Sequence, residues 1–274
     1  MKEDQLAKAN GFMWGSKTLG RGLGMALATS VFYAYGVNEG FAILICTMSL
    51  ILLLPILSKE LNYKAGHEAQ LYKNRLTFKE LVLGIRQSMF NPSAVAAIIF
   101  MLFANIGYGI FDVIYNEFYI KELGWNGEEI GHMRPYGMWL GGLIGLSAGL
   151  MTLYFRKRSL LLFFVIGQAV VFLTASTLSY ETSILLTSAV LIGVDAVDAG
   201  WSVLIFSILM ALCITQTSAT NFGIFMGFGN ISMLIGNNIA PAILGFGDFT
   251  FAFTFAALTL IPCLISGYYL TKET

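Results

Sequence analysis

The chain has 274 residues, of which 57% are hydrophobic and 12% are charged, and its formal net charge is zero. A soluble globular domain is about 25% charged, so this deficit, together with a mean hydropathy of +0.73, indicates that lipid surrounds most of the chain. A net charge of zero gives no reason to expect a nucleic acid or another strongly charged macromolecule as a partner.

The sequence contains neither a recognisable signal peptide nor a cysteine motif for a cofactor. The first ten residues, MKEDQLAKAN, are polar and predict no signal peptide. Cys46, Cys213 and Cys263 lie far apart in apolar stretches, without a CxxC spacing. Isolated thiols of this kind are typical packing residues. We therefore expect no cofactor and no metal.

Hydrophobic stretches long enough to cross a bilayer recur along the whole chain. A membrane core of about 30 Å needs roughly 20 apolar helical residues. This criterion predicts eight spans, at 11–35, 39–58, 93–118, 134–154, 159–179, 183–213, 217–244 and 249–270. A buried soluble core would require polar faces on these helices, and segments such as 43–57 and 249–270 have none. The expected fold is an all-α, polytopic membrane bundle of eight transmembrane helices.

The distribution of basic residues predicts the orientation of the chain. Lys and Arg concentrate in the two tails and in the loops that follow the second and fifth spans. The opposite loops are acidic and hold Lys121, with Arg134 at the mouth of the fourth span. Because positive charge stays on the cytoplasmic side, we expect both termini to be cytoplasmic.

The one long loop, 59–92, falls on the predicted cytoplasmic side and contains an amphipathic segment, 77–90. Thr77 and Glu80 have the spacing of a capping box at a helix start. Apolar residues then share one helical face: Phe78, Leu81, Val82, Ile85 and Met89. This pattern predicts a short helix on the membrane surface, which serves as a linker between two bundles.

Several spans carry polar residues at helical spacing. The first has Lys17 and Arg21 on one face, and the third has a stripe of Asn105, Tyr108 and Asp112, continued by Tyr115 or Asn116. The fourth has glycines four residues apart, at 137, 141, 145 and 149, a spacing that lets another helix approach closely.

The sixth and seventh spans are polar as well. Asp195 and Asp198 lie one turn apart and are followed by Trp201, and the seventh span contains Asn221 and Asn230 among glycines. The second, fifth and eighth spans are almost wholly apolar. Every third span is thus apolar enough to face lipid. Secondary transporters have internal repeats of this kind.

Charges at membrane depth are costly and usually face a bundle interior or a cavity. For Asp112, Asp195 and Asp198 the alternatives are a solute or coupling role and an internal ion pair that fixes helix packing. For Lys17 and Arg21 they are contact with an anion, pairing with an acid, or snorkelling towards the inner surface. The candidate substrate-binding or coupling residues are Lys17, Arg21, Asn105, Tyr108, Asp112, Asp195, Asp198, Trp201, Asn221 and Asn230.

Four segments resemble the major facilitator superfamily, and within it the branch of muropeptide permeases and acetyl-CoA transporters. The stretch SILMALCITQTSATNFGIFMGFGNISMLIGNNIAPAIL (207–244) is similar to the junction of helices ten and eleven. ELGWNGEEIG (122–131) resembles the connection of helices seven and eight, and ANGFMWGSKTLGRGLG (9–24) resembles the start of helix five. GLMTLYFRKRSLLLF (149–163) is similar to the basic cytoplasmic motif between helices eight and nine, without the Asp and Gly that this motif usually has.

This resemblance implies a register in which the eight spans match helices five to twelve. It divides the chain into the last two helices of an N-terminal half (1–58), a cytoplasmic linker (59–92) and a C-terminal six-helix half (93–274). The expected fold is therefore a partial superfamily fold. Helices one to four have no counterpart, so we expect either a fragment of a longer carrier or a partner polypeptide that supplies them. The branch has an acid about where Tyr108 lies, whereas here the acid is one turn on, at Asp112.

The function implied by the resemblance is secondary active transport of a small solute, proton-coupled, in the inner membrane of a bacterium. The alternative is a non-transporting or truncated membrane protein that needs a partner. An enzyme is not expected, because the only histidines, His67 and His132, lie in loops on opposite sides, which excludes a zinc cluster. An aspartyl protease needs acids that face each other from two helices, so Asp195 and Asp198 on one helix do not suffice. Asp112 with Asp195 could form such a pair in principle, but nothing else in the sequence supports it.

Overall fold

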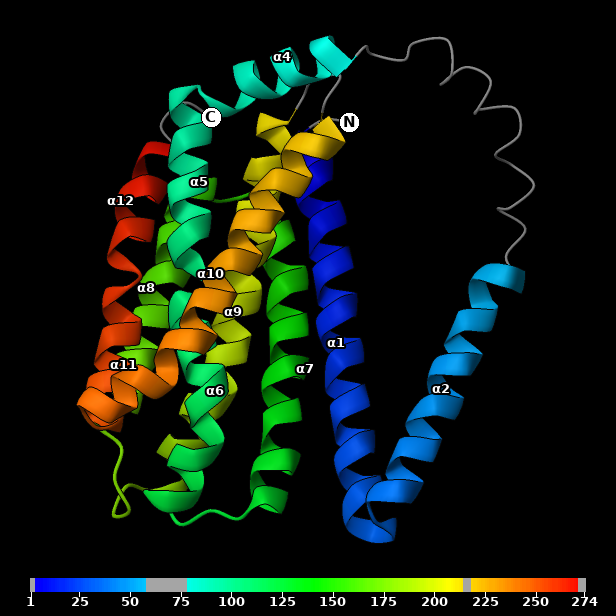
Figure 1. Cartoon of the computed structure of the whole chain (residues 1–274), viewed down its shortest axis with the longest axis vertical. Coiled ribbons are helices and arrows are strands. Elements are labelled where there is room, and N and C mark those ends of the chain that lie inside the picture. The colour runs from blue at the N-terminus through cyan, green and yellow to red at the C-terminus, as the bar shows by residue number, and fades with distance from the viewer. Residues whose placement is uncertain (1–2, 58–77, 214–217, 271–274) are drawn as a thin grey trace.

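The computed structural model describes residues 3–57, 78–213 and 218–270, and every regular element within these ranges is a helix. The all-α class is thus confirmed (Figure 1). The helices are α1 (Glu3–Tyr35), α2 (Val37–Leu57), α4 (Phe78–Met89), α5 (Pro92–Ala104), α6 (Ile106–Lys121), α7 (Gly127–Met151), α8 (Lys157–Ala175), α9 (Ile184–Leu212), α10 (Ser218–Phe246), α11 (Phe249–Leu258) and α12 (Ile261–Leu270).

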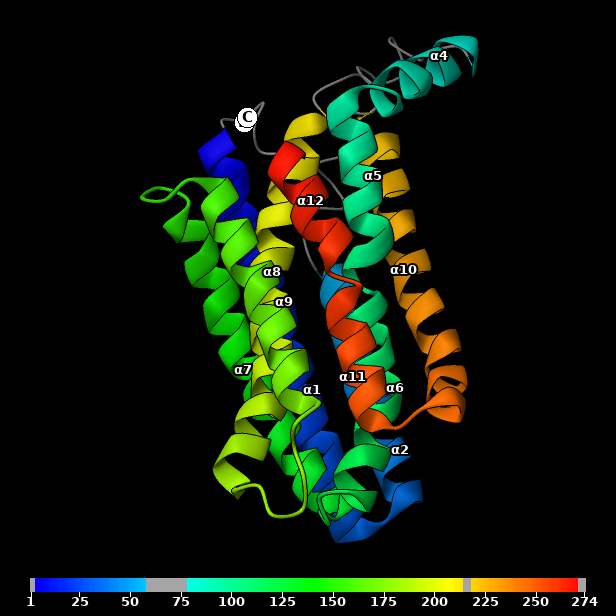
Figure 2. The ribbon, with the colours of Figure 1, turned by 90° about the vertical axis from the view of Figure 1, so that its left-hand side faces the viewer.

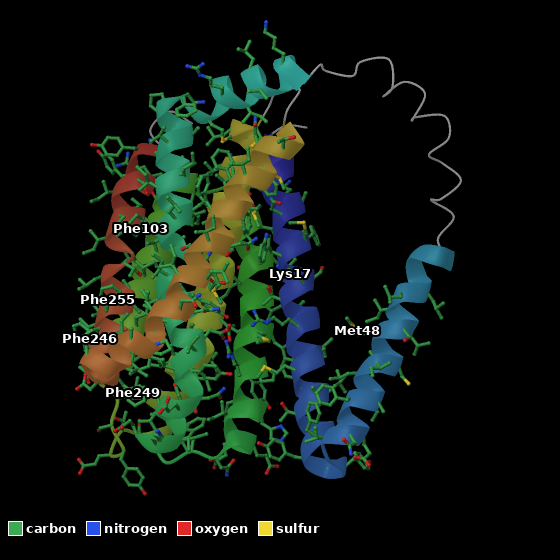
Figure 3. All side chains as sticks on the ribbon, viewed as in Figure 1. Lys17, Met48, Phe103, Phe246, Phe249 and Phe255 are labelled. Carbon is green, nitrogen blue, oxygen red and sulfur yellow. The ribbon has the colours of Figure 1, made fainter. Side chains whose placement is uncertain are left out.

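Four segments within the described ranges are long and apolar enough to cross a membrane, as judged by length and composition. They are Pro92–Lys121, Lys157–Ala175, Ile184–Leu212 and Phe249–Leu270. A fifth apolar stretch, Val37–Leu53, is shorter. These segments support a membrane protein, and large apolar side chains such as Phe103, Phe246 and Met48 accordingly lie exposed on its outer surface (Figure 3).

A tight turn joins α1 to α2. Gly36 has a φ of +98°, a left-handed conformation that favours glycine. At the start of α2, Gly40 lies against the ring of Phe32, where a larger residue would clash. Beyond this turn α2 diverges from the rest of the bundle (Figure 1).

Two of the predicted spans are broken helices. The third span divides at Asn105, whose backbone amide donates to Ser232 Oγ (3.0 Å) and whose side-chain Nδ2 donates to the Gly229 carbonyl (3.1 Å), both on α10. The eighth span divides between Leu258 and Ile261, just before Pro262, which has no amide hydrogen to donate. Both segments still qualify as single spans by length and composition, although contacts with α10 and a proline interrupt their helical hydrogen bonds.

The helices form two groups, which Figure 2 shows side by side. We call α1, α7, α8 and α9 the α7 group, and α5, α6, α10, α11 and α12 the α6 group. α8 also packs against α11 and α12, so apolar side chains join the groups on that side. By contrast, α6 and α7 make few contacts with each other.

Glycines set the close packing inside the α7 group. A Cβ atom on Gly137 would lie 2.9 Å from the Ile192 carbonyl oxygen, and one on Gly141 would lie 2.9 Å from that of Asp195. On the other side of α7, a Cβ on Gly15 of α1 would lie 3.0 Å from the Gly142 carbonyl oxygen. The prediction that the glycine repeat permits close helix approach is confirmed.

The helix predicted within 77–90 is present as α4, whereas its place on the membrane surface and its role as a linker stay predictions. α4 lies across one end of the bundle (Figure 1), with Met89 buried and Ile85 packed against the core. Thr77, the predicted cap, lies outside the described residues, as does the preceding part of the linker. The start of α1 and the end of α12 lie at this same end of the bundle.

Candidate functional site

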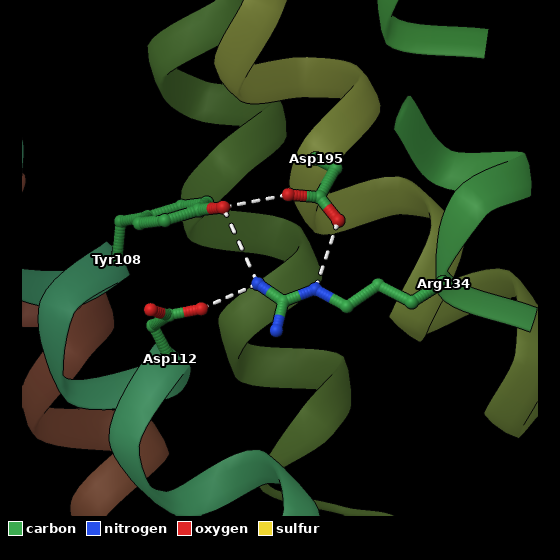
Figure 4. A network of polar contacts seen from close by, with 4 residues as sticks. All are labelled: Tyr108, Asp112, Arg134 and Asp195. Carbon is green, nitrogen blue, oxygen red and sulfur yellow. Dashed lines mark hydrogen bonds and ion pairs between the residues drawn. The ribbon is translucent and has the colours of Figure 1, made fainter. Parts of the chain in front are cut away.

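Four polar side chains from three helices meet inside the bundle (Figure 4). The hydroxyl of Tyr108 on α6 donates to Asp195 Oδ1 on α9 at 2.6 Å. Arg134 on α7 donates from Nε to Asp195 Oδ2 at 3.3 Å, and from Nη2 to Asp112 Oδ1 on α6 at 2.5 Å and to the Tyr108 hydroxyl at 3.4 Å. We call these four residues the Arg134 network.

Arg134 is the residue that the sequence analysis missed, because it was placed at a helix mouth. In the structure α7 begins seven residues earlier, at Gly127, where Asn126 and Glu129 form a reciprocal capping box. At a rise of 1.5 Å per residue, Arg134 lies about 10 Å inside the helix. The Asn-x-x-Glu spacing in ELGWNGEEIG was the signal that would have located this start.

The network is buried to different degrees along its length. The side chains of Arg134 and Asp195 are 4% and 6% exposed, whereas that of Asp112 is 29% exposed. The Arg134 guanidinium also lies over the ring of Tyr115, with Cζ 4.1 Å from the ring centroid. Two carboxylates thus share one guanidinium, and the outer one, Asp112, is the one that solvent can reach.

Local packing explains why Arg134 reaches Asp195. Gly137 follows Arg134 by three residues and lies on the α9 side of α7, where a Cβ atom would come within 3.4 Å of Asp195 Cβ. The absence of that side chain allows the two backbones to approach closely. The network is therefore supported by the same glycine contacts that hold α7 against α9.

A second set of predicted charges lies beside the network. Asp198, one turn from Asp195, interacts electrostatically with Asp195, Arg21 and Lys17. Arg21 also interacts electrostatically with Asp112 and with Tyr108. These interactions place the basic face of α1 next to the acidic face of α9.

Lys17 and Arg21 are two of the three basic residues of α1. Lys17 (Figure 3) lies over the ring of Trp14, with Nζ 3.9 Å from the centroid. Within the described part of the chain, neither Lys17 nor Arg21 has a carboxylate within 4.0 Å. Both side chains are exposed, so α1 presents two positive charges that have no direct ion-pair partner there.

The remaining candidates do not join the network. Asn105 bonds to α10 at the helix break, and Trp201 is a core residue that packs edge-on against Phe100, with 6.0 Å between ring centroids. Asn221 is fully buried on α10, whereas Asn230 is exposed on the same helix.

A pocket of about 470 Å³ opens at the end of the bundle where α7 begins. Its lining includes Thr29 and Tyr33 of α1 and Tyr115 and Asn116 of α6. Tyr115 belongs both to this pocket and to the surroundings of Arg134, so the pocket leads towards the network.

A scan against models of protein families and a search of curated proteins found no match to this chain.

Proposed function

We propose that the chain is a secondary active transporter of a small solute, of the major facilitator type, with eight membrane spans and both termini in the cytoplasm. The observation that carries the proposal is the Arg134 network, a buried guanidinium bound to acids on two helices inside an apolar bundle. Ionisable groups at this depth are costly and usually mark a solute or proton pathway. The resemblance of residues 207–244 to the muropeptide permease branch supports the same class and a bacterial inner membrane.

The network suits proton coupling because of where its bonds lie. Tyr108 and Asp112 belong to the α6 group, and Arg134 and Asp195 belong to the α7 group, so its hydrogen bonds join the two groups where they otherwise make few contacts. A proton on Asp112 would neutralise that carboxylate and weaken its bond to Arg134. Arg134 would remain bound to Asp195, and the two groups could then separate on the α6–α7 side.

The solute would approach through the 470 Å³ pocket at the start of α7, and neutral hydrogen-bonding side chains line its path. Lys17 and Arg21 would then attract an anionic group on the solute, because they have no carboxylate within ion-pair distance among the described residues. Alternating access by rocking of the two helix groups would carry the solute across.

Asp112→Asn tests the proposal. The full chain is reconstituted in proteoliposomes and offered a panel of radiolabelled small anionic and zwitterionic compounds. We expect an imposed pH gradient to drive the uptake of at least one of them. Asp112→Asn should abolish the pH-driven component. Glu117→Gln is the matched control, since Glu117 is an exposed acid on the same helix that pairs with Lys121.

Unchanged pH dependence in Asp112→Asn would remove this carboxylate from the mechanism. If the unaltered chain shows no pH-driven uptake and Asp112→Asn lowers its stability, the network would instead serve helix packing. Solute binding without flux would favour a non-transporting membrane protein.

A further inference from the structure

A groove of about 810 Å³ runs between α5 and α12, at the end of the bundle where α4 lies. Its walls are mostly apolar and include Val95 and Ile99 of α5 and Pro262 and Ile265 of α12. Seven residues separate Pro92 from Ile99, so the groove extends about 10 Å along the helix axis. It belongs to no part of the Arg134 network.

Aromatic side chains lie at the mouth of this groove. Phe90 follows the end of α4 and is 79% exposed, and Tyr269 near the end of α12 is 61% exposed; both line the groove. Exposed aromatic residues at a helix end are typical of the boundary between lipid tails and head groups. The groove therefore begins at the membrane surface and leads into the apolar region.

Two basic residues lie near these aromatic residues. Arg86 lies in the last turn of α4, four residues before Phe90. Arg158 at the start of α8 lies over the ring of Tyr268, next to Tyr269, with Cζ 3.5 Å from the ring centroid. Each basic residue thus lies close, along the chain or through an aromatic neighbour, to a residue that lines the groove.

We propose that this groove binds an anionic phospholipid, with an acyl chain between α5 and α12 and the phosphate beside Arg86 and Arg158. The apolar walls favour a hydrocarbon chain, and basic residues near the membrane surface favour an anionic lipid. The pocket at the opposite end, lined by Glu128, Glu129 and Trp125, has the wrong charge for this ligand. The lipid site is thus specific to one end of the molecule and adds a ligand to the proposed carrier.

The test uses the purified full chain in detergent with two photoreactive lipids that have the same acyl chains, phosphatidylglycerol and phosphatidylcholine. We expect phosphatidylglycerol to cross-link to residues 92–99 or 262–269 and to be retained preferentially in native mass spectrometry. Arg86→Gln and Arg158→Gln should each reduce that preference about fivefold, which is the equivalent of 1 kcal/mol. They should leave the acyl cross-link in place.

Ala96→Trp fills the groove and should abolish the cross-link, whereas Val170→Trp, on the exposed face of α8, should not. Equal retention of the two lipids, or charge variants without effect, would overturn the proposal. If glycerol phosphate alone displaced the bound phosphatidylglycerol as effectively as the intact lipid does, the site would be a bare phosphate site. That result would also overturn the proposal. If the chain forms a dimer without lipid and Ala96→Trp dissociates this dimer, the groove would bind a second copy of the chain instead of a lipid.

Discussion

The bond between Arg134 and Asp195 offers the sharpest test of the structure. Both side chains are almost fully buried, so removing Arg134 leaves Asp195 as an uncompensated charge, whereas removing Asp195 leaves Arg134 paired with the partly exposed Asp112 alone. Breaking a buried pair in this way costs about 3–5 kcal/mol. Neutral hydrogen bonds between membrane helices contribute only about 0.6 kcal/mol on average. We therefore expect Arg134→Gln to lower the free energy of unfolding by about 3 kcal/mol. Asp195→Asn should lower it by less, because Arg134 keeps its ion pair with Asp112.

The double variant should lose much less than the sum of the two single variants, because it leaves neither charge alone. We expect an interaction energy of at least about 1.5 kcal/mol in the double-mutant cycle. Asp112→Asn should cost only about 1 kcal/mol, since Asp112 is partly exposed and its ion pair is screened.

The assay is reversible unfolding of the purified full chain in mixed micelles with a rising mole fraction of SDS, followed by far-ultraviolet circular dichroism. Additive single-variant effects, within about 0.5 kcal/mol in the double variant, would refute direct pairing of Arg134 with Asp195. A larger cost for Asp112→Asn than for Asp195→Asn would contradict the order of burial in the structure.

Three further predictions concern helix packing and capping, and the same unfolding assay measures each. Gly141→Leu should lower the free energy of unfolding by about 1–3 kcal/mol, because its Cβ atom would meet the Asp195 carbonyl. Gly20→Leu is the control and should be tolerated, because nothing lies within 4 Å of its Cβ position. Equal costs for the two variants would contradict the close contact of α7 and α9. Gln168→Leu should leave the free energy of unfolding unchanged or raise it by about 1 kcal/mol. Gln168 is 2% exposed, and its amide atoms have no hydrogen-bond partner among the described residues. A loss above about 1 kcal/mol would mean that a bound water forms hydrogen bonds with the Gln168 amide. Asn126→Ala should cost about 1 kcal/mol through the lost cap of α7, and no effect would show that the start of α7 does not depend on it.

Hydropathy and charge predicted the helical segments well because lipid imposes a simple rule on them. Each predicted span corresponds to one helix or to a broken pair of helices, and the amphipathic linker helix lies where the apolar face of 77–90 placed it. The glycine spacing of α7 was equally informative, since small residues at every fourth position have few roles other than close contact. The number of spans that actually cross the membrane stays a prediction.

The candidate site was predicted only in part. Tyr108, Asp112 and Asp195 were identified by their depth in apolar segments, and the structure brings them together. Arg134 was missed because hydropathy places a helix start where polar residues end, whereas α7 starts with two polar turns. The break at Asn105 was missed because it depends on Ser232 and Gly229 of α10, and no local pattern in the sequence encodes that contact.

The two helix breaks lie against each other, since a Cβ on Gly107, just after the first break, would be 2.6 Å from the carbonyl oxygen of Ala256, just before the second. The Asn105 amide donates to Ser232 Oγ and Pro262 has no amide hydrogen, so bending here sacrifices fewer helical hydrogen bonds than bending elsewhere. The two breaks therefore mark one level of the α6 group. This level separates α5 and α12, which line the proposed lipid groove, from the part of the group that holds Tyr108 and Asp112, and of this group only α10 continues past it as one helix that packs against both α5 and α6.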